Sequence, residues 1–114
     1  MALTAKMIRH LRERDPYCVH CGIDQDLIPH HRRNRKMGGS KLLDRYDNLL
    51  MICSAYNGDM ESNARVARES REYGHKLGQW DGFESPVFDQ INVTWFMLDK
   101  TGNKTECDPP SYLI

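Results

Sequence analysis

The sequence predicts one small α+β domain, on three observations. The chain has 114 residues, a length that allows a single domain. Apolar residues near the N-terminus recur at helical spacing, whereas the C-terminal part contains short β-branched and aromatic runs that are typical of strands. Hydrophobic residues make up 39% of the chain and charged residues 28%, which favours a globular protein over a disordered one.

Residues 1–16 predict a helix. Its apolar positions share one helical face: Leu3, Met7, Ile8 and Leu11. We expect Thr4 to cap this helix and Pro16 to end it. Mostly off the apolar face, and therefore expected to face solvent or a polyanion, are Arg9, Arg12 and Arg14.

Residues 17–78 are expected to form the core of the domain. A tight turn at 18–22 is followed by a short extended segment at 27–31. The apolar run at 49–52 predicts a strand or the edge of a turn.

A second helix is expected from Ala55 or Asn57 to Tyr73, with Gly74 as its stop. Its inward positions are expected to be Met60, Ala64 and Ala67. His75 follows the helix, and we interpret it as a partner of the helix dipole or a surface residue rather than a metal ligand.

Residues 79–114 form a tail of different character. The segments 87–88 and 93–98 predict strands, and the turn residues at 101–103 lead into a further strand at 104–107, which gives a β-hairpin. The tail's aromatic residues are expected to pack in or over the core rather than to stack on bases: Trp80, Phe88, Trp95 and Phe96.

Two cysteines, Cys18 and Cys21, have the spacing with which a tight turn presents two thiolates to one tetrahedral zinc. Cys53 is available as a third ligand, but the position three residues further on is Tyr56. His20 is geometrically awkward as a fourth ligand, and two further candidates are remote in sequence: His75 and Cys107. The alternative is that the cysteines pack as small hydrophobic residues.

The net charge of zero conceals an uneven distribution. Residues 1–45 contain ten Lys and Arg against five Asp and Glu, whereas residues 46–114 contain six against eleven. The densest basic run is Arg32-Arg33-Asn34-Arg35-Lys36. Such a run is either a solvated loop or a contact for phosphates.

The order of these residues resembles the HNH endonuclease family. That family combines a CxxC knuckle, an Asp-His or His-His pair, a Gly-Gly turn, an Asn-Leu pair and a second CxxC followed by His or Asn. This chain has, in the same order, Cys18-x2-Cys21, His30-His31-Arg32, Gly38-Gly39-Ser40, Asn48-Leu49, Cys53-x2-Tyr56 and Asn57. The resemblance covers about residues 17–75. Within the family, the chain is similar to the small HNH proteins of bacteriophages and is an HNN variant.

The resemblance implies a role for each matched polar residue. His31 takes the place of the general base that activates water, and Asn48 takes that of the residue bracing the loop that presents the base. His30 and Asn57 take the places of ligands to one divalent cation, Mg²⁺ or Mn²⁺, which stabilises the leaving 3′-oxygen. The products would be a 5′-phosphate and a 3′-hydroxyl.

The basic run begins one residue after the proposed base, which favours phosphate contacts over a solvated loop. We therefore expect these residues to bind DNA: Arg32, Arg33, Arg35 and Lys36.

The implied fold is a small ββα-metal (His-Me finger) nuclease core at 17–78, between the N-terminal helix and the hairpin tail. The implied function is a metal-dependent DNA endonuclease, phage-encoded and of low intrinsic sequence specificity. The alternatives are a non-catalytic zinc-knuckle module that binds DNA or protein, and a structural subunit that docks through its acidic tail. A homodimer and a phage or host protein partner remain open.

No apolar run approaches the ~20 residues that cross a bilayer, so no membrane association is expected. Charges interrupt the apolar positions of the first residues, which is unlike a signal peptide. We therefore expect a cytoplasmic protein, in the host cytoplasm if phage-encoded, with reduced thiols.

Overall fold

Strand β2 (Leu49–Cys53) is the centre of the fold, and all five of its residues are buried. The computed structural model describes residues 3–34, 41–78 and 80–113. Because successive strand residues point to opposite faces, β2 contributes to two apolar clusters. Leu49 and Met51 pack against α1, whereas Leu50 and Ile52 pack against the C-terminal strands and α2.

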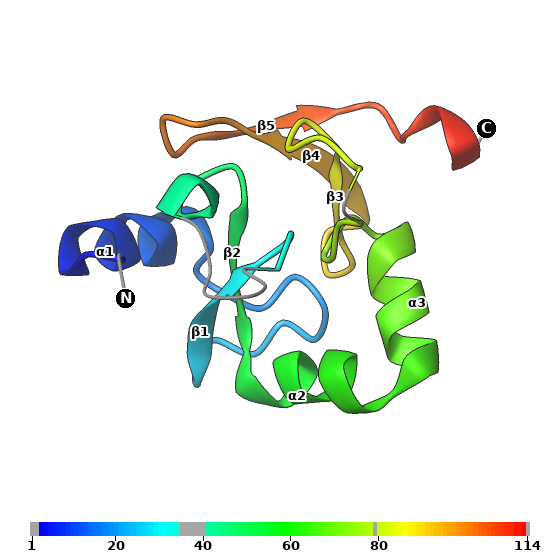
Figure 1. Cartoon of the computed structure of the whole chain (residues 1–114), viewed down its shortest axis with the longest axis horizontal. Coiled ribbons are helices and arrows are strands. Elements are labelled where there is room, and N and C mark those ends of the chain that lie inside the picture. The colour runs from blue at the N-terminus through cyan, green and yellow to red at the C-terminus, as the bar shows by residue number, and fades with distance from the viewer. Residues whose placement is uncertain (1–2, 35–40, 79, 114) are drawn as a thin grey trace.

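The described residues form an α+β domain with three helices and two antiparallel sheets. The helices are α1 (Ala5–Arg14), α2 (Ser54–Ser62) and α3 (Ala64–Glu72). The strands are β1 (Leu27–His31), β2, β3 (Val87–Asp89), β4 (Thr94–Leu98) and β5 (Lys104–Cys107), with short 3-10 turns at Lys41–Leu43 and Ser111–Leu113. Figure 1 shows α1 and α3 on either side of the β1–β2 pair, and the three-stranded sheet above them in this view.

The β1–β2 pair has a register that places Leu27 opposite Cys53 and His31 opposite Leu49. Strand β2 continues directly into α2. The second sheet has the order β3-β4-β5, and Gly102 at the turn between its last two strands has a φ of +96°. The predicted strands of the tail and its hairpin are therefore confirmed.

Helix α1 begins and ends as predicted. The Thr4 side chain accepts a hydrogen bond from the Met7 amide, and the helix ends at Arg14, two residues before Pro16. The expectation that Arg14 faces solvent or a polyanion is wrong. Its guanidinium is buried against the Asp15 carboxylate at 2.8 Å and donates to backbone carbonyls of the loop and strand around β2.

The single helix expected up to Tyr73 is two helices. Asn63 has extended backbone angles (φ −126°, ψ 113°), and its side chain accepts from the amides of Arg65 and Val66, which caps α3. Ala64 is exposed rather than inward because the break reorients the second helix. Gly74 ends α3 as predicted, with a φ of +73°, and a Cβ there would clash with the carbonyl oxygen of Pro86.

The tail belongs to the same core as the rest of the domain. Val87, Phe96 and Leu98 share one apolar cluster with Leu50. Trp80, by contrast, is 89% exposed and does not cover the core as predicted. No helix in the described parts of the chain is long and apolar enough to span a bilayer.

Candidate functional site

The two histidines at the end of β1 have different environments, as their opposite strand faces require. His30 is buried, and its Nε2 lies 2.8 Å from the carbonyl oxygen of His75. Because a carbonyl only accepts, Nε2 carries the proton and Nδ1 keeps its lone pair. Burial lowers the pKa of His30 to about 4, so the ring is neutral at pH 7.

Asn57 on α2 is brought to His30. The Asn57 side chain acts to raise the pKa of His30, in opposition to burial, which indicates that the two side chains lie close together although they are on different elements. The side chain of Asn57 is half-buried. Because α2 follows directly on β2, the strand that pairs with His30 also fixes the position of the first turn of α2. An imidazole and an amide therefore lie near each other at this point, and their role as ligands stays a prediction.

His31 is oriented by a residue that sequence reasoning missed. Its Nε2 lies 2.7 Å from Oδ1 of Asp44, and the two side chains are 16% and 4% exposed. A carboxylate accepts from Nε2–H, so Nδ1 is the ring nitrogen that is left to accept a proton. Asp44 lies in the loop between the two strands, and no local pattern in the sequence connects it with His31.

Asn48 occupies a fully buried position between the two chain segments that flank the histidines. Its Oδ1 accepts from the Arg33 amide at 2.8 Å. Its Nδ2 donates to the carbonyl oxygens of Arg33 at 3.2 Å and of Leu43 at 3.0 Å. These contacts have the bracing geometry expected of Asn48, since they tie both ends of the connecting loop together.

The prediction that Arg32 contacts DNA is wrong. The side chain is 0% exposed, and its guanidinium donates to four backbone carbonyls: those of Asp47, Gly74, Phe83 and Ser85. Burial lowers the pKa of Arg32 to about 10, so the group stays charged at neutral pH. Arg32 is therefore a link between β1 and the start of the tail.

The rest of the basic run is only partly within the described residues. The Arg33 guanidinium stacks over the Phe83 ring at 4.5 Å and donates to the Asp81 carbonyl. Arg35 and Lys36 lie outside the described residues, as does the Gly38-Gly39-Ser40 turn.

Three of the predicted zinc ligands converge. The sulfurs of Cys18, Cys21 and Cys53 all lie within 4.8 Å of one another, and those of Cys21 and Cys53 are 3.5 Å apart. Gly22, with a φ of +80°, donates to the Cys18 carbonyl at 2.8 Å and closes the tight turn. Sulfurs bound to one tetrahedral zinc lie about 3.8 Å apart, so donor set and spacing both fit such an ion.

Tyr56, at the expected fourth position, is turned away from the sulfurs. Its hydroxyl lies 2.6 Å from Nδ1 of His75, and its ring stacks on His20 at 3.8 Å. Among the described residues the cluster therefore has three ligands, and a fourth would come from solvent on the side of the exposed Cys21. Burial raises the pKa of Cys53 to about 11, so a bound cation is what would favour its thiolate.

His75 is fully buried, so its interpretation as a surface residue or helix-dipole partner is wrong. Its Nε2 donates to the Phe88 carbonyl at 2.7 Å, and its Nδ1 accepts from the Tyr56 hydroxyl. Since its own carbonyl holds His30, His75 connects the cysteine cluster with the histidine site.

Comparison of the chain with protein-family models, curated proteins and solved structures gave no match. The site is therefore interpreted from its own geometry.

Proposed function

We propose that the chain is a metal-dependent DNA endonuclease with a site similar to that of HNH nucleases. The observations that support this proposal are the orientation of His31 by Asp44 and the placement of the adjacent His30 near Asn57. Phosphodiester hydrolysis needs a base for the attacking water and a cation near the leaving oxygen. In this proposal His31 is the base, and His30 and Asn57 hold the cation.

His31 acts as the general base in this proposal. Asp44 accepts from Nε2–H and so directs the free lone pair of Nδ1 to the water. Asn48 keeps the backbone beside His31 in place through its contacts with Arg33 and Leu43. Asp44 and Asn48 are thus positioning residues, because they act through His31 and its loop.

His30 and Asn57 would hold the divalent cation, Mg²⁺ or Mn²⁺. The fixed proton on Nε2 of His30 leaves Nδ1 as a metal donor, which fits this task. Both donors are neutral, so we expect weak metal affinity until substrate phosphate oxygens add negative charge. When bound, the cation supplies positive charge at the scissile phosphate and the leaving 3′-oxygen.

Plasmid nicking tests the proposal. The parent should convert supercoiled to nicked plasmid only with Mg²⁺ or Mn²⁺, and His31→Ala should lower the rate about 10²–10⁴-fold, which is the usual contribution of a general base. His10→Ala is the matched control, because His10 lies on α1 and contacts Gly102 rather than the site. Equal nicking by the parent and His31→Ala, or none with either metal, would refute the proposal.

A second candidate function is a non-catalytic zinc module that binds DNA or protein. The convergence of Cys18, Cys21 and Cys53 favours this candidate, since a metal there needs no catalysis. Zinc bound at about one ion per chain, together with DNA binding and no nicking, would support it. Metal-dependent nicking that is lost in His31→Ala would exclude it.

A further inference from the structure

A basic cleft lies beside the histidine site. Its volume is about 390 Å³, and its charged lining residues are Arg33, Arg71 and Lys76. They come from three places: the chain after β1, the last turn of α3 and the loop that follows α3. No Asp or Glu is among the described lining residues, so the cleft concentrates positive charge in a chain whose net charge is zero.

The cleft is fixed to the end of β1 by backbone contacts. The His75 carbonyl holds His30, and the Leu77 amide donates to the Arg32 carbonyl at 2.7 Å. Lys76, between these two contacts, therefore has its backbone anchored beside the proposed cation ligand. Its positive charge also contributes to the low pKa of His30, after burial, which is the main cause.

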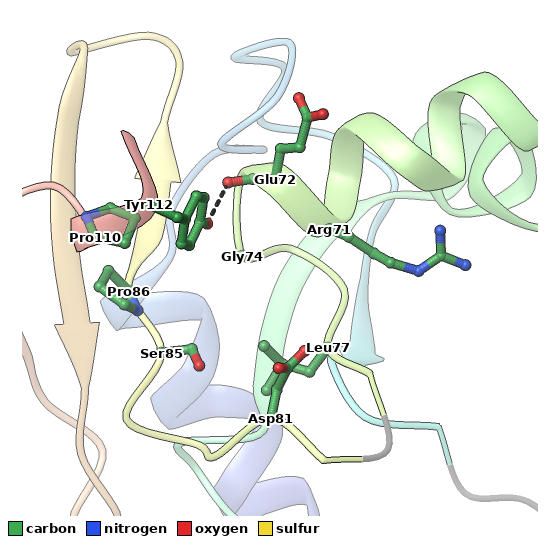
Figure 2. Close-up of a pocket in the computed structure, with 9 residues that line it drawn as sticks. All are labelled: Arg71, Glu72, Gly74, Leu77, Asp81, Ser85, Pro86, Pro110 and Tyr112. Atoms are coloured by element: carbon green, nitrogen blue, oxygen red, sulfur yellow. Dashed lines mark hydrogen bonds between the residues drawn. The ribbon is translucent and has the colours of Figure 1, made fainter. Parts of the chain in front are cut away.

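The cations of the cleft differ in how far their charges are already used within the fold. Figure 2 shows the Arg71 side chain extending away from Pro110 and Tyr112, although all three residues line the same neighbouring cavity. Arg71 thus lines both this cavity and the basic cleft. No ion pair of Arg71 or Lys76 occurs within the described residues. Arg33 is held by its stacking on Phe83 and by its hydrogen bond to the Asp81 carbonyl, so Arg71 and Lys76 are the cations of the cleft that can contact a ligand.

We propose that this cleft binds backbone phosphates of duplex DNA on one side of the proposed cleavage site, with Arg71 and Lys76 as contact residues. Guanidinium and ammonium groups from separate elements suit successive phosphates, which fix the register of a duplex without reading its sequence. The position of the cleft beside a cleavage site rests on the proposed endonuclease function. Phosphate binding by Arg71 and Lys76 does not depend on that function.

Binding of a fluorescent duplex tests the proposal. All variants carry His31→Ala and are measured without chelator, so that cleavage is prevented and any zinc is retained. The cleft variant is Arg71→Gln/Lys76→Gln. The control is Arg65→Gln/Arg68→Gln, which removes the same charge from exposed positions of α3 outside the cleft.

Removal of two phosphate contacts should weaken binding about tenfold or more near 0.1 M salt and lower the slope of log K against log salt by about 2. The control should change affinity less than about twofold and keep the slope. Equal losses in both pairs, or no salt-dependent binding at all, would overturn the proposal. If the double variant melts below the parent, the single variants Arg71→Gln and Lys76→Gln decide, each with an expected slope change of about 1.

The outcome is distinguishable from failure of the endonuclease proposal. If the parent binds DNA through the cleft but nicks no plasmid, the cleft proposal stands and the endonuclease proposal fails. If the parent nicks plasmid but the cleft and control variants bind DNA equally well, the endonuclease proposal stands and the cleft proposal fails.

Discussion

The two ends of the β1–β2 pair carry different chemistry. At one end, where Leu27 lies opposite Cys53, three sulfurs converge. At the other end, where His31 lies opposite Leu49, the groups are imidazoles, a carboxylate and amides. Soft sulfur donors suit zinc, whereas nitrogen and oxygen donors suit a cation that also binds phosphate. One short strand pair thus separates a cluster of three cysteines that could hold a structural metal from a proposed reactive site.

The ends also differ in how their side chains are held. Cys53 is part of the fold at its end, because it is the N-cap of α2 and its sulfur accepts from the Tyr56 amide at 3.4 Å. The backbone of His31 pairs with Leu49, and within the described residues its imidazole is held by the hydrogen bond with Asp44. Changes at the cysteine end should therefore alter stability, and changes at the histidine end should alter rate.

The largest expected effect is at the cysteine end. Cys53→Ala should abolish zinc binding and lower the free energy of unfolding by more than about 4 kcal/mol, since it removes a metal ligand and a buried side chain together. Metal analysis of the purified protein and thermal unfolding measure these changes. Cys107→Ala, in β5 and outside the cluster, should keep the zinc. Purified parent protein without zinc would contradict the structural metal site.

A smaller effect is expected from Asp44→Asn. The amide can no longer enforce a proton on Nε2 of His31, so kcat for nicking should fall about 10–100-fold with KM changed less than about twofold. Asp47→Asn is the matched control, because Asp47 is also buried in this loop but pairs with Arg45. Unchanged kcat in Asp44→Asn, or equal losses in both variants, would show that Asp44 does not position the base.

The smallest effect concerns His75, which connects the two ends. Burial lowers the pKa of His75 to about 3, below the unfolded value of 6.5, so the unfolded chain binds more protons at acidic pH. Stability from this residue is present above pH 6.5 and is lost as the pH falls, by at most about 1.4 kcal/mol per pH unit. Urea unfolding between pH 7 and 5 should show a shallower pH slope in His75→Gln. Equal slopes would contradict the prediction.

The parts of the fold that the sequence predicted well depend on local signals. Thr4, Gly74 and the turn around Gly102 are recognisable because caps and turns need particular residue types. The break at Asn63 had such a signal as well, since Asn is a common N-cap, but the helical pattern on both sides concealed it.

The errors at the site have a different origin. The basic run beside His31 predicts that Arg32 contacts DNA, and the position of His75 after a helix predicts a surface residue or a partner of the helix dipole. Each is instead buried with hydrogen bonds to backbone groups from distant segments. Asp44 was missed for the same reason, since its contact with His31 depends on how the loop closes. Burial of polar side chains is decided by long-range packing, which one sequence does not reveal.

The most direct test of the central claim is to measure nicking and stability of His31→Ala together. The variant should lose at least about 100-fold of the metal-dependent nicking rate while it keeps its melting temperature and its zinc content. That result would show that the histidine end of the β1–β2 pair serves nicking and that the cysteine end serves stability. Nicking at the parent's rate by the folded, zinc-containing variant would contradict the account.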